Sequence, residues 1–194
     1  MKLYLASKSP RRRALLMQMG VEAELLLFDT PEESKPGESP TDYSVRVTRE
    51  KLEASQQKIL QEKLPDLPVL CADTEVVFDG KITGKPRDYD HAFAMLKQCS
   101  GRSHEVITSV GVQYRNFQKI VTQSTTVTFA DIPDVEIHKY LAMDDYKDKA
   151  GSYGIQSYIG QFISNINGCF YSVMGLPLNV VRDLLLTLPP SSRQ

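Results

Sequence analysis

Strand-like and helix-like segments alternate along this chain, and this alternation is the feature that most constrains its fold. Apolar and β-branched runs are typical of strands at residues 2–6, 23–28, 69–78, 105–114, 120–130, 161–166 and 170–173. Helical periodicity is found at residues 9–19, 40–63, 89–99, 134–143 and 176–188. This order predicts an α/β fold. Because the long neighbouring strands within residues 105–130 favour a hairpin, we expect a mixed sheet rather than a purely parallel one.

The start of the first helix carries an unfavourable charge. Ser9 and Pro10 are typical of a helix N-cap and first position, and three arginines, at positions 11, 12 and 13, follow directly. Unpaired N–H groups already make this end of a helix partly positive. A bound anion would resolve the conflict, because helix N-termini and guanidinium groups both bind phosphate. The alternative is that all three arginines point into water, where screening keeps the cost small.

Composition limits the partners that this chain can bind. The formal net charge of −1 over 194 residues does not favour the broad basic face expected of a nucleic-acid binder, so we expect a small anion instead. No apolar run approaches the ~20 residues of a membrane span, which predicts a cytoplasmic protein without membrane contact. The three cysteines lack metal-ligand spacing and are expected to be buried free thiols in a reducing compartment: Cys71, Cys99 and Cys169.

A carboxylate interrupts the most apolar strand. Asp73 lies within VLCADTEVVF, where a buried carboxylate costs several kcal/mol unless it is paired, hydrogen-bonded or bound to a metal. Glu75, two residues further on, shares its face of the strand. Beside an anion site, such a carboxylate could bind Mg²⁺ or accept a proton from water. The alternative is that this face of the strand is solvated.

Further polar groups could line the same site. Lys51 lies on one partly apolar face of the predicted helix, although a second apolar face could be the buried one instead. Lys85, between Gly84 and Pro86, has a backbone stiffened in an extended form that could direct its ammonium into a cleft. Gln156, in the glycine-containing segment DKAGSYGIQ, offers an amide that could read the edge of a base. A solvated lysine and an ordinary turn are the alternatives.

Together these segments resemble the Maf family of house-cleaning nucleoside triphosphate pyrophosphatases. The resemblance extends from Lys2 to about Leu188 and rests on LASKSPRR, REK, ADTEVV, GKPRD, SGRSHEVIT, DKAGSYGIQ and GLPL, in that order. It implies an elongated, mixed α/β fold of Maf/ITPase-like type, with helices flanking the sheet and two lobes around a deep cleft. Residues 1–188 would form this single domain, and residues 189–194 a frayed tail. It also implies a homodimer and a divalent metal cofactor, Mg²⁺ or Mn²⁺.

The resemblance also implies roles for individual residues. The phosphate-facing start corresponds to Ser7, Arg11 and Arg12. Asp73 would be the proton acceptor, acting with the catalytic lysines Lys51 and Lys85. Glu32 and Asp73 would bind the metal, although the acidic loop departs from the usual family pattern and leaves the choice between Glu32 and Glu33 open. Hydrolysis would take place between the α and β phosphates of a nucleoside triphosphate.

Three positions point to one branch of the family. Arg12, Thr74 and Gln156 resemble the branch that reads dTTP and UTP. The branch that prefers 7-methyl-GTP has Trp at the position of Arg11 and Glu at that of Gln156. A glutamine both donates and accepts, which suits uracil and thymine, whereas a glutamate only accepts. We therefore expect a dTTP/UTP pyrophosphatase. The alternatives are the 7-methyl-GTP enzyme and a non-catalytic nucleotide-binding regulator linked to septum formation.

Overall fold

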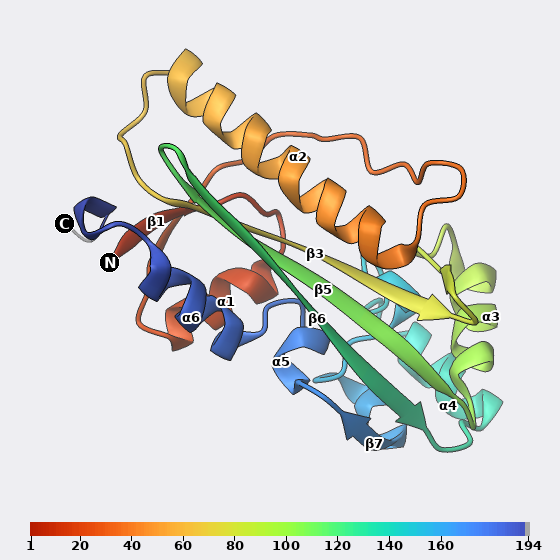
Figure 1. Cartoon of the computed structure of the whole chain (residues 1–194). Helices are drawn as coiled ribbons and strands as arrows, with labels where there is room; N and C mark the ends of the chain where they lie inside the picture. The colour runs from red at the N-terminus through yellow and green to blue at the C-terminus, as the bar shows by residue number, and fades with distance from the viewer. Residues whose placement is uncertain (193–194) are drawn as a thin grey trace.

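A mixed sheet runs the length of the molecule (Figure 1). The computed structural model describes residues 1–192. The strand order is β2-β1-β3-β5-β6-β7, and β4 pairs with β3. β1 is parallel to both neighbours, whereas the other pairings are antiparallel, which confirms the mixed sheet. The strands are β1 Lys2–Leu5, β2 Glu22–Leu25, β3 Val69–Phe78, β4 Lys81–Ile82, β5 Ser103–Tyr114, β6 Phe117–Phe129 and β7 Ile163–Asn167.

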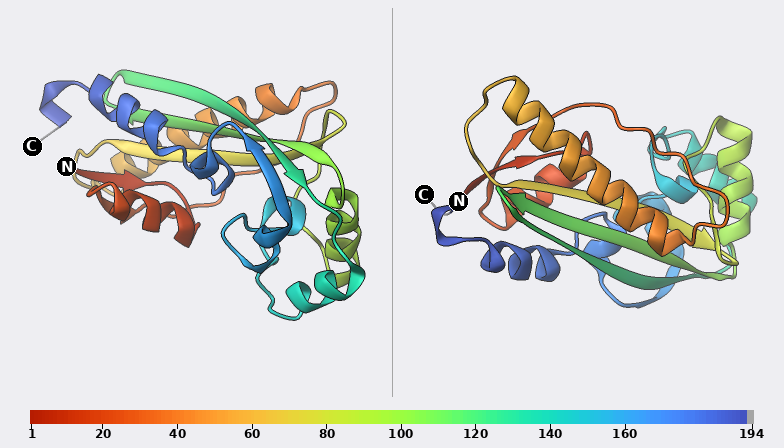
Figure 2. Two further views of the ribbon diagram at one scale, coloured as in Figure 1. Left: turned by 90° about the horizontal axis from the view of Figure 1, so that it is seen from below. Right: turned by 45° about the horizontal axis from the view of Figure 1, so that its top comes forward.

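Helices cover both faces of the sheet near the chain termini (Figures 1 and 2). α2 (Pro40–Gln61) crosses one face, where Leu52 packs with Tyr4 and Cys71. α1 (Pro10–Gln18) and α6 (Leu178–Thr187) cover the opposite face, which they share with neighbouring strand residues such as Leu5 and Leu70. Successive strand residues point to opposite faces, so β1 and β3 supply side chains to both layers.

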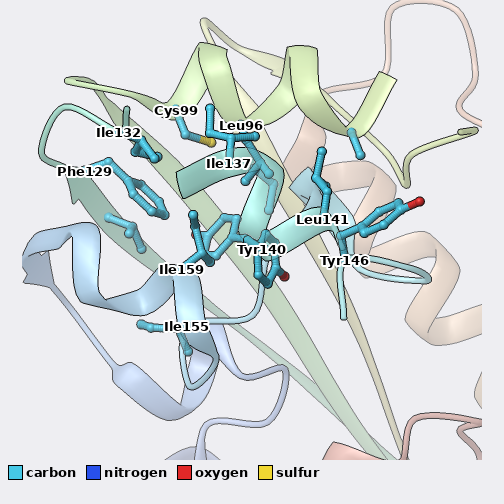
Figure 3. Packing of buried hydrophobic residues seen from close by; sticks show 14 of the residues in the cluster. Leu96, Cys99, Phe129, Ile132, Ile137, Tyr140, Leu141, Tyr146, Ile155 and Ile159 are labelled. Carbon is cyan, nitrogen blue, oxygen red and sulfur yellow. The ribbon is translucent and has the colours of Figure 1, made fainter. Parts of the chain in front are cut away.

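A separate cluster packs around the other end of the long strands (Figure 3). It joins α3 (Tyr89–Cys99), α4 (Asp134–Leu141) and the 3₁₀ segments η1 (Ala150–Ser152) and η2 (Tyr158–Phe162). The largest fully buried side chains of this cluster include Tyr140, Phe129 and Ile137. The long strands β3, β5 and β6 contribute to both ends of the molecule, and β5 and β6 form the expected hairpin.

Several sequence-based expectations need correction. Residues 170–173 form the short helix α5 (Phe170–Val173) instead of a strand, since a short apolar run fits a buried helical turn equally well. Cys169 is only half-buried, although Cys71 and Cys99 are buried free thiols as expected. The tail is not wholly frayed: Pro190–Ser192 forms the 3₁₀ segment η3, and Ser192 is buried, while residues 193–194 lie outside the described part. No helix within residues 1–192 is long and apolar enough to span a membrane.

Candidate active site

A cleft opens along one edge of β3. β1 pairs with β3 only as far as Leu70, because the chain leaves β1 at Ala6 to begin α1. β4 pairs with β3 again only from Val77. A cavity of about 820 Å³ lies beside the intervening stretch, which contributes Asp73, Thr74 and Glu75 to its lining. The remaining walls come from the start of α1, the loops before α2 and α3, residues 148–150 and 153–156, and the end of α5.

Arg12 joins three segments at the floor of this cleft. Its Nε donates to the Gly175 carbonyl at 2.8 Å, Nη1 to Ser7 Oγ at 3.2 Å and Nη2 to Thr74 Oγ1 at 3.0 Å. Burial lowers the pKa of Arg12, and the negative charge of Asp73 opposes this shift. A guanidinium has five N–H donors, so two remain for a ligand. Arg12 therefore holds three segments together through hydrogen bonds and is also a candidate anion-binding group.

The start of α1 faces the cleft, as the arginine pattern predicts. Ser7 and Arg11 line the cavity with Arg12, whereas Arg13 is exposed. Ser9 occupies the N-cap position, but its side chain makes no capping hydrogen bond. Instead, its own N–H donates to Ser7 Oγ at 3.1 Å. An anion beside this helix end would meet two arginines and the positive end of the helix dipole together.

A buried ion pair lies in the wall opposite. Lys51 Nζ on α2 is 3.0 Å from Asp73 Oδ1 on β3 and 2.7 Å from Glu32 Oε1 in the preceding loop. The Asp73 side chain is 6% exposed, and its second oxygen, Oδ2, is buried without a hydrogen-bond partner. A buried carboxylate oxygen without a donor is costly, which makes Oδ2 a natural acceptor for a water proton or a ligand for a cation.

The acidic loop is held so that Glu32 turns inward. Tyr43 Oη on α2 donates to the Glu32 carbonyl at 3.1 Å, and Arg46 Nη2 donates to the Glu33 carbonyl at 2.9 Å. Glu32 lines the cavity, while Glu33 is exposed and does not line it. Of the two glutamates that the sequence left open, the structure thus places Glu32 at the cleft.

The charged side chains of this wall shift one another's pKa values. Burial acts to raise the pKa of Glu32, but Lys51 and Lys85 outweigh it, so this pKa lies below its ordinary value. Burial likewise acts to lower the pKa of Lys51, but Asp73 and Glu32 outweigh it and raise that pKa. Burial raises the pKa of Glu75 to about 8, and the charges of Asp73 and Glu32 add to the effect. Glu75 lines the same cleft as Asp73 and Thr74.

The loop carrying Lys85 is hydrogen-bonded to the end of the molecule that contains α3, α4, η1 and η2, which we call the far lobe. The Gly151 N–H donates to the Gly84 carbonyl at 3.0 Å. Gly151 has φ +67°, and a Cβ there would lie 2.9 Å from Val76 Cγ1, so only glycine fits without displacement. Lys85 is exposed and lines the cavity, as expected from the Gly-Lys-Pro sequence. Its position therefore depends on the packing of residues 150–152 against β3.

Two of the specificity positions occupy different surroundings. Thr74 Oγ1 accepts from Arg12 and from Thr108 Oγ1, the latter at 3.0 Å, so its hydroxyl is held by a network. Gln156 lines the cavity but is exposed, and its amide is available to a ligand. The structure brings all the predicted site residues to one cavity: Ser7, Arg11, Arg12, Glu32, Lys51, Asp73, Thr74, Lys85 and Gln156.

Sequence reasoning missed two cations of this cavity: Lys8, which is exposed and pairs with Asp29, and Lys149. Lys149 lines the cleft and is only 7% exposed, with Nζ 2.9 Å from Asp145 Oδ1. The Asp145-to-Lys149 spacing of four residues was the available signal, but such pairs are common on solvated surfaces. Only the packing of the far lobe shows that the lysine of this pair is enclosed, while the Asp145 side chain stays 42% exposed.

The carboxylates fit one mode of metal binding. Within residues 1–192, no group of three histidine, cysteine, aspartate or glutamate side chains could hold a metal ion by itself. Mg²⁺, however, is usually bound by one or two carboxylates together with substrate phosphates. Glu32 and the unpartnered Oδ2 of Asp73 supply hard oxygen ligands of this kind. The donor set therefore suits a cation that arrives with a phosphate substrate.

Comparison with known proteins gives consistent matches over nearly the whole chain. A dTTP/UTP pyrophosphatase of Nitrosomonas europaea is 45% identical, covering 94% of this chain and 92% of the relative. One from Chromobacterium violaceum is 45% identical (95% and 93% covered), and one from Escherichia coli K12 is 43% identical (94% and 91%). Among solved structures, the Staphylococcus aureus Ham1 protein aligns with a TM-score of 0.48 at 10% identity, covering 96% of this chain and 98% of that one.

The family model described as "Maf-like protein" matches residues 2–188. That match includes every cleft residue described above, from Ser7 to Gly175. Together with relatives that are more than 40% identical over more than 90% of their length, it establishes that this chain belongs to the Maf family.

Proposed function

We propose that this protein is a nucleoside triphosphate pyrophosphatase that hydrolyses dTTP and UTP to the nucleoside monophosphate and pyrophosphate. The observation that carries the proposal is the buried, unpartnered Oδ2 of Asp73, a residue that lines a cleft rich in cations. Three relatives at 43–45% identity bear the name dTTP/UTP pyrophosphatase. Removal of such nucleotides from the pool is a house-cleaning role.

The triphosphate would bind where the cations converge. Arg11, Arg12, Lys51 and Lys85 all line the cavity, together with the N-terminus of α1. Phosphoryl transfer depends chiefly on positioning and on neutralising the charge of the crowded oxygens. These groups would therefore contribute more to rate than the general base alone.

Asp73 would act as the base. Its Oδ2 accepts a proton from water while the water oxygen attacks the α-phosphorus. The bond between the α-phosphorus and the α–β bridging oxygen breaks, and pyrophosphate leaves with that oxygen. Lys51, 3.0 Å from Asp73 Oδ1, holds the carboxylate by an ion pair and leaves Oδ2 for the water.

We also propose a divalent cofactor, Mg²⁺ or Mn²⁺, held by Glu32, Asp73 and the substrate phosphates. When bound, such a cation neutralises phosphate charge and favours departure of pyrophosphate. Support comes from the hard oxygen donors at this wall of the cleft. The buried free thiols Cys71 and Cys99 support a reducing compartment, and we propose the cytoplasm. We also propose a homodimer, which sedimentation equilibrium would test.

Gln156 would read the base. Its amide can donate to O4 and accept from N3–H of uracil or thymine. Gln156→Glu places an acceptor against the O4 acceptor and should lower kcat/KM for UTP by about ten- to a hundredfold, while CTP loses less. The measurement is the UTP-to-CTP ratio of kcat/KM in wild type and variant, and an unchanged ratio would remove Gln156 from this role.

A nucleotide panel tests the function directly. The purified protein is incubated with dTTP, UTP, CTP, 7-methyl-GTP and Mg²⁺ or Mn²⁺, and released pyrophosphate is measured. We expect release from dTTP and UTP in wild type and none in Asp73→Asn. Release from 7-methyl-GTP alone would assign the chain to the other branch, and binding without release from any nucleotide would favour a non-catalytic regulator.

A further inference from the structure

Lys149 is a buried cation whose position calls for a ligand. Burying an ammonium costs several kcal/mol unless its donors are matched. Lys149 Nζ donates to the main-chain carbonyl and to Oδ1 of Asp145, the latter at 2.9 Å. An ammonium has three N–H donors, and in the described part of the chain the two oxygens of Asp145 are the acceptors recorded for this one. One donor is therefore left at a residue that lines the cleft.

The same residue lies next to Gln156. A Cβ placed on Gly154 would be 3.1 Å from Lys149 Cε and 3.5 Å from Gln156 Nε2, so both side chains flank the bare Cα of Gly154. Any larger residue at this position would crowd both of them. The ammonium stem and the amide thus lie along one wall of the cavity.

Charge decides which part of a nucleotide suits Lys149. Asp145 neutralises the ammonium of Lys149, whereas among the described residues no acidic side chain forms an ion pair with Arg11 or Arg12, which also line the cavity. A neutralised pair with one spare donor suits a carbonyl oxygen better than a phosphate. The phosphates already have Arg11, Arg12, Lys51 and Lys85.

The donor pattern of this wall matches one kind of base. Uracil and thymine present acceptor, donor and acceptor at O4, N3–H and O2. Gln156 satisfies one acceptor and the donor, and leaves one carbonyl without a partner. We propose that Lys149 completes the base-reading wall by donating to O2, so that Lys149 and Gln156 together select uracil and thymine. This inference rests on the proposed function, because it assigns a second specificity residue to the same site.

Thio-substituted nucleotides test this assignment. Sulfur is a weak hydrogen-bond acceptor, so 2-thio-UTP removes the contact with O2 and 4-thio-UTP removes the one with O4. We expect wild type to prefer UTP over 2-thio-UTP by about tenfold in kcat/KM. Lys149→Met should lose about tenfold with UTP and little with 2-thio-UTP, so that the preference disappears. The preference for UTP over 4-thio-UTP should persist in the variant.

Two further variants distinguish an effect on base recognition from an effect on folding. Lys149→Met leaves the Asp145 carboxylate unpaired, so the double variant with Asp145→Asn repeats the measurement without that stranded charge. Lys147→Met is the matched control, because Lys147 pairs with Asp144 at 2.9 Å on the exposed surface and does not line the cavity. Lys147→Met should keep the wild-type kcat/KM ratios of UTP to 2-thio-UTP and of UTP to 4-thio-UTP.

The outcomes distinguish the two proposals. Absence of pyrophosphate release from UTP by wild type would overturn the proposed function and this inference with it. Hydrolysis of UTP with the same UTP-to-2-thio-UTP ratio in wild type and in both Lys149 variants would overturn only the inference. Equal losses with all three nucleotides would also overturn it, and would assign Lys149 a structural or phosphate-binding role.

Discussion

Replacing Lys51 by methionine tests whether this lysine holds the carboxylates of the cleft. Methionine keeps most of the side-chain volume but removes the ammonium that lies 2.7 Å from Glu32 and 3.0 Å from Asp73. Breaking a buried ion pair by removing one partner costs ~3–5 kcal/mol. Glu32 is 40% exposed and the cleft is open to water, so we expect a smaller cost than for a fully buried pair, about 2–3 kcal/mol.

Thermal unfolding provides the assay. For a domain of this size, 1 kcal/mol corresponds to about 2–4 °C, so Lys51→Met should lower Tm by roughly 4–12 °C at pH 7.5. The folded pKa of Glu32 lies below its ordinary value of 4.5. Its contribution is therefore present above that value and lost as the pH falls through the folded pKa, so the gap between wild type and variant should narrow in acid.

A double variant identifies the stranded charge. If Asp73 carries the penalty, Lys51→Met combined with Asp73→Asn should recover at least half of the lost Tm, because no buried carboxylate remains without its cation. Lys58→Met, which breaks an exposed pair on the same helix, should change stability by less than about 0.5 kcal/mol. A Lys51→Met protein as stable as wild type, or a double variant less stable than the single one, would refute the reasoning.

Two other predictions follow from the cleft contacts, and a third from His104, a buried residue of β5 whose Nε2 lies 2.6 Å from Tyr153 Oη. Asp73→Asn should abolish pyrophosphate release and keep nucleotide affinity, measured by calorimetry, within about tenfold; near wild-type turnover would exclude Asp73 as the base. Arg12→Lys, which can replace only one of three hydrogen bonds, should cost about 1–3 kcal/mol in urea unfolding and at least tenfold in kcat/KM; unchanged values would contradict its position. Burial lowers the pKa of His104 to about 4, so the free energy of unfolding should decrease as the pH drops below 6.5, by up to ~3 kcal/mol at pH 4. His104→Gln, compared with wild type by urea unfolding, should lack this part of the pH dependence.

Local pattern was enough to assign most elements and the orientation of several side chains. The strand at residues 69–78 has the predicted bounds, and Asp73, which interrupts its apolar run, lines the cleft. The arginines after Pro10 indicated an anion site because their charge conflicts with the helix end, a property of a few neighbouring residues. Hydrophobic periodicity could not resolve residues 170–173, because the four residues Phe-Tyr-Ser-Val fit a helical turn as well as a strand.

Tertiary structure decided which of these side chains meet. The sequence placed Lys51 between two competing stripes, and only the packing of α2 on the sheet brings it to Asp73, 22 residues further along the chain. Arg12 reaches the Gly175 carbonyl across 163 residues, and the enclosure of Lys149 depends on the far lobe. Periodicity fixes the face that a residue takes within its own element. The distance between two elements depends instead on how their buried faces pack together, which no local window of sequence contains.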